Sequence, residues 1–183
     1  MPDLGAYFRS APVSEFSGTV YRICTARYGD NLVSMRGSFL NGARYNIRGY
    51  FGTLYTSLSK ETARREMARY FTAPPKDGFV QAAILLRLSR VVDLTNRRLL
   101  RKAGVAWEQL IGAHYTITQE IGRRAWENGI EALLAPSAAH PTERNLAVFL
   151  DNQRLSWEVA LTSLTSKPPE RRLRARLPAL QAN

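Results

Sequence analysis

The chain has 183 residues, enough for one domain with a sizeable core, and its 45% hydrophobic content is ordinary for a soluble globular protein. Lys and Arg number 26 against 15 Asp and Glu, a formal net charge of +11, which favours a polyanionic partner: nucleic acid, a phosphate-bearing ligand or an acidic protein. The single cysteine excludes an intramolecular disulfide framework and a cysteine-based metal cluster. No apolar run is long enough to span a bilayer, and residues 1–10 lack the hydrophobic core of a secretory signal, so we expect a cytoplasmic protein with no membrane partner.

The first half of the chain predicts two strands and a helix, with a long loop between the strands. Residues 18–30 are rich in β-branched and aromatic side chains, which is typical of a strand. Residues 31–52 hold Gly, Asn, Arg and isolated aromatics without periodicity, which indicates a loop of the kind that carries function. A short strand is expected at 53–57. A helix is expected from Ser59, a suitable N-cap, to Phe71, before the prolines of "APPKDG".

The second half of the chain predicts alternating strands and helices. Residues 79–88 are nearly continuous in apolar side chains, as expected of a central strand, and 89–96 indicate a further strand. Helices are expected at 97–105 and 116–129, with 106–115 helical or irregular. Residues 130–138 predict a strand, and 146–164 predict two strands around a turn at Asp151 and Asn152.

These elements predict a fold of the α+β class: a single domain whose mixed, mainly antiparallel sheet is interrupted by helices. We place the domain at residues 19–166. An N-terminal segment precedes it at 1–18, and a basic, proline-punctuated tail follows it at 167–183.

Glu66 occupies an unexpected position in the helix predicted at 59–71. Core-facing residues recur at helical spacing (Ala63, Met67, Tyr70 and Phe71), and Glu66 shares their side of the helix. Burying an unpaired carboxylate is costly, so Glu66 must find donors or a cation. Three explanations are open at this point: a structural ion pair with a nearby arginine, a helix rotated so that Glu66 reaches water, or a position at the floor of a pocket where it binds the hydroxyls of a ligand.

The common cofactor and catalytic motifs are absent from the sequence. There is no P-loop, no GxGxxG fingerprint and no HExxH. The two histidines, His114 and His140, have no metal-ligand neighbours at suitable spacing, and no GxSxG elbow supports a serine hydrolase. We therefore expect neither a metal nor a bound cofactor.

The remaining candidates form a set of arginines, hydroxyl-bearing residues and one carboxylate. Arginines bind phosphates through bidentate hydrogen bonds, tyrosines stack on flat heterocycles, and a carboxylate holds ribose hydroxyls and stabilises an oxocarbenium-like transition state. Together they suggest binding of a nucleotide and breakage of a glycosidic bond. The set comprises Arg22, Arg44, Tyr45, Asn46, Tyr55, Ser57, Glu66 and Ser137.

The order of these residues resembles the RES domain family, which is named after an Arg, a Glu and a Ser. They match Arg22 in "VYRIC", Glu66 in "LYTSLSKETARREMARY" and Ser137 in "IEALLAPSA". Asn145 in "RNLAVF" also has a counterpart in the family. The segment "NGARYNIRG" is similar to the family's "GGRWNxxG", and the family's "LYTS" and "DLT" are both found in this sequence. The resemblance covers roughly Thr19 to Leu150.

The resemblance implies a fold like that of ADP-ribosyltransferases and the toxin of a bacterial toxin–antitoxin pair that degrades NAD by hydrolysis or phosphorolysis. It implies that NAD is the substrate, that an Xre-like antitoxin is the protein partner, and that the toxin is a homodimer. Glu66 and Arg22 would be catalytic. Arg44, Tyr45, Tyr55, Ser57, Ser137 and Asn145 would line the site. Two positions depart from the family pattern: Ala43 replaces its second Gly and Tyr45 its Trp, which puts substrate affinity in doubt.

In the mechanism that this resemblance suggests, Arg22 and Arg44 neutralise the pyrophosphate. Tyr45 or Tyr55 stacks on nicotinamide or an adjacent ring, and Ser137 orients the ligand or hydrogen-bonds Glu66. The Glu66 carboxylate stabilises positive charge as the N-glycosidic bond lengthens.

Two other functions stay open. One is transfer of ADP-ribose to a protein or nucleic acid by the same site. The other is a non-catalytic nucleic-acid binder, which the charge suggests. No helix-turn-helix, RRM or zinc-finger pattern supports direct nucleic-acid binding.

Overall fold

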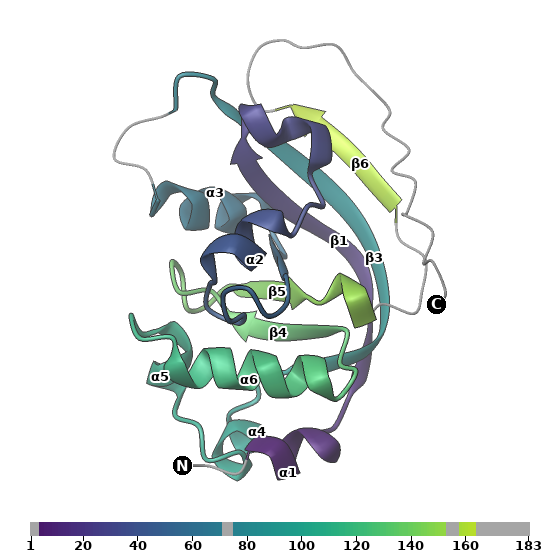
Figure 1. Ribbon diagram of the computed structural model, residues 1–183, viewed down its shortest axis with the longest axis vertical. Helices are drawn as coiled ribbons and strands as arrows, with labels where there is room; N and C mark the ends of the chain where they lie inside the picture. Colours follow the sequence, from purple (N-terminus) through teal and green to yellow (C-terminus); the bar gives the residue numbers. More distant parts are fainter. Residues whose placement is uncertain (1–3, 71–74, 153–157, 164–183) are drawn as a thin grey trace.

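The computed structural model describes residues 4–70 and 75–152 in full and the backbone of 158–163 (Figure 1). The helices are α1 (Leu4–Arg9), α2 (Arg36–Asn41), α3 (Lys60–Ala68), α4 (Arg97–Lys102), α5 (Trp107–Ile111), α6 (Thr116–Glu127) and the 3-10 turns η1 (Ala26–Asn31) and η2 (Leu150–Asn152). The strands are β1 (Ser14–Thr25), β2 (Leu54–Ser57), β3 (Phe79–Asp93), β4 (Ala132–Pro136), β5 (Arg144–Val148) and β6 (Glu158–Ser163).

Five of the strands close into a ring. The sheet runs in the order β1-β2-β5-β4-β3-β6, and β1 also pairs with β3, which joins the two ends of the five-stranded part. All pairings are antiparallel except β3 with β4, which is parallel. The predicted α+β fold with a mixed, mainly antiparallel sheet is confirmed, and the sheet is closed like a barrel.

The long strand β3 holds this arrangement together. Figure 1 shows β1 and β3 as two long curved strands side by side, with β6 along the outer edge of β3. Residues 80–85 of β3 pair with β1 on one edge and with β6 on the other, whereas residues 91–93 pair with β4. β6 and β4 thus follow one another along the same edge of β3.

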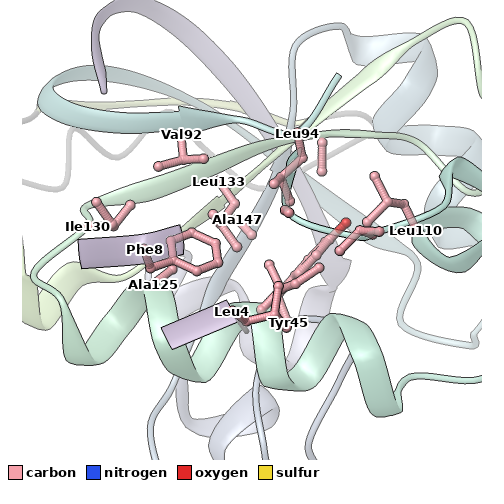
Figure 2. Close-up of a cluster of buried hydrophobic side chains, with 14 of the residues drawn as sticks. Leu4, Phe8, Tyr45, Val92, Leu94, Leu110, Ala125, Ile130, Leu133 and Ala147 are labelled. Atoms are coloured by element: carbon pink, nitrogen blue, oxygen red, sulfur yellow. The ribbon is translucent and has the colours of Figure 1, made fainter. Parts of the chain in front are cut away.

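Alternation along the strands divides the buried side chains into two clusters. One lies inside the ring and includes Val20, Leu54, Ile84, Leu146 and Val148. The other lies between the outer face of the sheet and helices α1 and α6. Figure 2 shows this second cluster, in which Leu4 and Phe8 of α1 and Ala125 of α6 meet Leu133 and Ala147 from the strands.

Several predicted elements differ from the observed ones. The expected strand at 18–30 begins earlier, at Ser14, and ends at Thr25, because residues 26–31 turn into η1. The expected loop at 31–52 contains the short helix α2. The two segments 79–88 and 89–96 form one strand, β3, which ends at Asp93.

The two strands expected around Asp151 and Asn152 exist, but they do not form a hairpin. β5 pairs with β2 and β4, whereas β6 pairs with β3. Asp151 and Asn152 lie in η2, where Asn152 Nδ2 donates to the carbonyls of Trp126 and Ile130 at 2.8 and 3.0 Å. That contact ties the end of β5 to the end of α6. The predicted tail at 167–183 and residue Phe71 lie outside the described residues.

A membrane-spanning helix and a metal-binding group are both absent from the described part of the chain. None of its helices combines the length and apolar character needed to cross a membrane. It also contains no group of three or more His, Cys, Asp or Glu side chains that could hold a metal ion.

Candidate active site

The helix that carries the candidate carboxylate begins as its sequence predicts. Ser59 has extended backbone angles, and its Oγ accepts a hydrogen bond from Thr62 N at 3.1 Å, so it is the N-cap of α3. Ala63 is buried against the sheet. On the solvent side Arg65 Nε donates to Glu61 Oε1 at 2.9 Å. This anchoring fixes which face of α3 is presented to the strands.

Glu66 lies on that inward face and is held through one of its two oxygens. Its Oε1 accepts hydrogen bonds from Ser137 Oγ at 2.6 Å and from Asn145 Nδ2 at 2.7 Å, with Ala139 N at 3.4 Å. The Glu66 side chain is 21% exposed. Hydrogen bonds of this length satisfy the carboxylate oxygen that α3 turns toward the strands.

Both donors are themselves oriented by their neighbours. Ser57 Oγ donates to Asn145 Oδ1 at 2.7 Å, so the amide of Asn145 must present its nitrogen to Glu66. The hydroxyl oxygen of Ser137 accepts from the backbone N–H groups of Ala139 and His140 at 3.2 and 3.1 Å, which leaves its proton for Glu66. The Glu66 carboxylate is thus positioned by hydrogen bonds whose donors are themselves held in one orientation.

The strand register explains why these residues meet. Ser57 in β2 lies directly opposite Asn145 in β5, and Asn145 lies opposite Ala135 in β4. Opposed residues in antiparallel strands project to the same face of the sheet. Ser137 follows the end of β4 at Pro136 and is fully buried. The end of β4 and the start of β5 therefore supply the two side-chain donors to Glu66, and β2 orients one of them through Ser57.

The second oxygen of Glu66 has a different neighbour. Arg69 Nη1 lies 3.5 Å from Glu66 Oε2, one turn further along the chain, and the Arg69 side chain is 45% exposed. Within the described residues Glu66 Oε2 has no shorter polar contact, so this oxygen can accept further hydrogen bonds. An exposed ion pair at this distance is weak.

Arg44 joins the loop before β2 to the end of α5. Its Nη1 donates to the carbonyl oxygens of Leu110 and Gly112, both at 2.8 Å, and its guanidinium lies 4.6 Å from the centre of the Tyr115 ring. A cation at a helix C-terminus satisfies carbonyls that the helix leaves free. Arg44 therefore already has protein partners, and its contacts position residues 110–115 beside the loop at 43–46.

Tyr45 and Tyr55 lie against each other but take different positions. The Tyr45 side chain belongs to the hydrophobic core with only 3% exposed (Figure 2), which does not fit the expectation that its ring stacks on a ligand. Tyr55 Oη accepts from Tyr45 N at 2.7 Å and donates to Asn46 Oδ1 at 3.0 Å. Burial raises the pKa of both phenols, so both stay neutral at physiological pH.

The direct contacts of Arg22 are not with Glu66 or with the residues that hold it, Ser137 and Asn145. It shares a face of β1 with Val20 and Cys24, which pack inside the ring, whereas the neighbouring Tyr21 pairs with Ser57. Arg22 Nη1 donates to Ser34 O at 2.9 Å, and burial lowers the pKa of its guanidinium. Among the described residues no carboxylate lies within ion-pair distance of Arg22.

The structure also identifies residues near Glu66 that the sequence interpretation did not place in a site. Helical spacing predicts Tyr70 in the core, yet it is 74% exposed, because α3 ends at Ala68. Loss of hydration and the nearby Tyr115 and Glu66 raise the pKa of the Tyr70 phenol, while Arg69 and Arg44 oppose this shift. Arg69, the C-cap residue of α3, is in direct contact with Glu66. The signal for Arg69 was present in the sequence, since it follows Glu66 by three residues, the spacing of neighbours on one helix face.

Three comparisons place this chain among known proteins. A family model described as the RES domain matches residues 19–165. A protein of Mycobacterium tuberculosis named as a probable NAD(+) phosphorylase is 34% identical over 110 residues, which make up 58% of this chain and 53% of that protein. The chain thus spans about half the length of this curated relative.

The fold also matches a solved structure. A chain in the crystal structure of the MbcT–MbcA toxin–antitoxin complex of M. tuberculosis superposes with a TM-score of 0.72 and 21% sequence identity. The match covers 87% of this chain and 89% of that one. At this identity the likeness establishes a shared fold.

Proposed function

Because this chain belongs to the RES domain family, we propose that it cleaves NAD at the bond between nicotinamide and ribose and that it is the toxin of a toxin–antitoxin pair. The observation that carries the proposal is the directed hydrogen bonding of Glu66, in which Ser137 and Asn145 hold one oxygen and the other has a single long contact with Arg69. A relative named as a probable NAD(+) phosphorylase supports NAD as the substrate.

The positioned carboxylate suits this chemistry in two ways. An ionised Glu66 accepts hydrogen bonds from the hydroxyls of the nicotinamide ribose. It also stabilises the positive charge that develops on the ribose as the C1″–N1 bond lengthens. Because its orientation is set before substrate binds, little reorganisation is needed during the reaction. Nicotinamide departs as a neutral base with the bonding electron pair, so the leaving group requires no proton.

The arginines divide into binding and positioning residues in this proposal. The guanidinium of Arg22 has five N–H donors, and within the described part of the chain it makes one hydrogen bond, to Ser34 O. We therefore assign Arg22 to a phosphate of NAD at a distance from Glu66, because its direct contact is with Ser34 and not with the residues that hold the carboxylate. The Nη1 of Arg44 already donates to two carbonyl oxygens. We therefore propose that the main role of Arg44 is to position Tyr115 beside the site.

Release of nicotinamide from NAD tests the function directly. Purified protein is incubated with NAD with and without phosphate, and nicotinamide is followed by chromatography. We expect the Glu66→Gln variant to lose about a hundredfold or more of the wild-type rate, since it keeps the side-chain shape but removes the charge. Glu61→Gln is the matched control: Glu61 lies on the same helix, and its carboxylate pairs with Arg65 on the solvent side.

The outcomes separate the possible reactions. ADP-ribose as co-product indicates water as the acceptor, and ADP-ribose-1″-phosphate indicates phosphate. A mass increase on a protein would point instead to ADP-ribosyl transfer. A wild-type rate in Glu66→Gln would contradict the mechanism.

The proposal extends to the cellular setting. We propose a cytoplasmic toxin that is neutralised by an Xre-like antitoxin and that forms a homodimer. The neighbouring fold in a toxin–antitoxin complex supports an antitoxin partner. Co-expression with the adjacent reading frames, followed by mass measurement of the purified assembly, tests the partner and the dimer together. A monomer that no neighbouring gene product binds or neutralises would contradict this part.

A further inference from the structure

The choice between water and phosphate as acceptor poses an electrostatic problem at Glu66. Phosphate is an anion near neutral pH, and it must approach the ribose carbon that Glu66 is stabilising. The carboxylate repels this anion, whereas it does not repel water. Efficient phosphorolysis therefore requires a cation close to Glu66 that can turn toward the incoming phosphate.

Arg69 has the required position and freedom. It is the C-cap residue of α3, its Nη1 is 3.5 Å from Glu66 Oε2, and its side chain is 45% exposed. The contact with Glu66 is a single long one rather than a bidentate pair, so little free energy is lost when the guanidinium turns away. A guanidinium also presents a planar fork of donors that matches phosphate oxygens.

Within the described residues, the other arginines near α3 do not contact Glu66. Arg64 and Arg65 both pair with Glu61 on the solvent side of the helix, at 4.0 and 2.9 Å. The Nη1 of Arg44 is taken by two carbonyl oxygens, and Arg22 reaches Ser34 rather than Glu66. In the described part of the chain, Arg69 is the cation in direct contact with the Glu66 carboxylate.

We propose that Arg69 forms the acceptor-phosphate subsite and thereby determines whether phosphate or water attacks the ribose. This inference rests on the proposed function. A phosphate oxygen held by Arg69 forms the new bond to C1″ while the C1″–N1 bond breaks and its electron pair leaves with nicotinamide. The product is ADP-ribose-1″-phosphate, and the proton of the hydrogen phosphate is lost to solvent. With water as acceptor, the attacking oxygen must lose a proton and no bound anion is needed.

The test compares two arginines on the same helix. Wild type, Arg69→Gln and Arg65→Gln are assayed with NAD over a series of phosphate concentrations at constant ionic strength, and ADP-ribose and ADP-ribose-1″-phosphate are separated and quantified. We expect Arg69→Gln to raise the KM for phosphate by about tenfold or more, the usual effect of losing a hydrogen bond to a charged group. The product ratio should move toward ADP-ribose. Arg65→Gln removes the same charge from the solvent side and should keep the wild-type values.

Phosphate binding at the subsite can also be measured in the absence of NAD, without catalysis. Thermal unfolding is recorded in phosphate and in chloride of equal ionic strength. We expect phosphate to raise the melting temperature of wild type and Arg65→Gln by about 2–4 °C when it is several-fold above its dissociation constant, and to leave Arg69→Gln unchanged. If the wild type does not release nicotinamide but shows this Arg69-dependent shift, the proposed function is wrong and the subsite stands. An Arg69→Gln variant with wild-type phosphate KM, product ratio and melting behaviour would overturn the subsite.

Discussion

Asn145 is the residue that connects Glu66 to the strands. Its amide accepts from Ser57 and donates to Glu66, both at 2.7 Å. In an Asn145→Ala variant the carboxylate loses a charge-assisted donor and its orientation. We expect kcat for NAD cleavage to fall about ten- to a hundredfold with a smaller change in KM. Steady-state kinetics check this, with Asn41→Ala as the control, since Asn41 contacts only its own exposed helix among the described residues. Equal losses in both variants would contradict the positioning role.

Tyr45 and Tyr55 form a matched pair for a stability measurement. The Tyr45 hydroxyl is buried and has no hydrogen-bond partner in the described part of the chain, whereas the Tyr55 hydroxyl makes two hydrogen bonds. Tyr45→Phe should therefore leave the free energy of unfolding unchanged or raise it slightly. Tyr55→Phe should lower it by about 1–3 kcal/mol, because a buried N–H and the Asn46 side chain lose their partner. Urea unfolding of the two variants distinguishes these effects, and the reverse order would contradict the hydrogen bonds described.

At the scale of elements, α6 lies unusually close to the loop that carries Arg44. Gly122 of α6 faces the backbone of Tyr45, and a Cβ at this position would overlap the Tyr45 carbonyl oxygen. Gly122→Ala must push the helix and the loop apart, so we expect it to cost about 3 kcal/mol or more of stability.

A second glycine gives the control for Gly122. A Cβ added to Gly37 in α2 would meet no atom within 4 Å. We therefore expect Gly37→Ala to leave the free energy of unfolding unchanged or to raise it by up to about 1 kcal/mol. Both variants are measured by urea unfolding at 25 °C. If the two variants had similar free energies of unfolding, the close approach of α6 to the loop would be contradicted.

The same contact explains why part of the site could not be predicted. The sequence of residues 31–52 shows aromatics and arginines in a segment without periodicity, which suggests that they face a ligand. The close approach allowed by Gly122 instead draws Tyr45 into the core, and Arg44 binds the end of α5. These contacts join residues far apart in the sequence, and no local pattern contains them. Helix α2 escapes prediction because it is short and none of its residues is buried.

The elements that the sequence did predict are those with a local signature. The Ser59 cap, the start of α3, helix α6 and the apolar strand β3 depend on spacing within one segment. For the site, family resemblance pointed to Glu66, Ser137 and Asn145, and the structure brings these three into contact. The core position predicted for Tyr70 is wrong because it extends helical spacing past Ala68, where the helix ends. The pairing of β6 with β3 rather than β5 is likewise non-local.

At the scale of the whole molecule, the closed ring makes β3 the element with the most complete backbone pairing. Residues 80–85 pair on both edges, so their amides should exchange with solvent only when the whole domain unfolds. Amides in η1 and α2, which have no buried residues, should exchange faster. Native-state hydrogen exchange checks this order. Fast exchange throughout residues 80–85 would show that the ring opens locally.

The ring also has a consequence for how the protein is made. Glu66 emerges from the ribosome early, but its two oriented donors follow 71 and 79 residues later. A nascent chain that already contains the whole of α3 therefore lacks the groups that hold its carboxylate. Under the proposed function, such an unfinished chain is harmless to the cell that synthesises it.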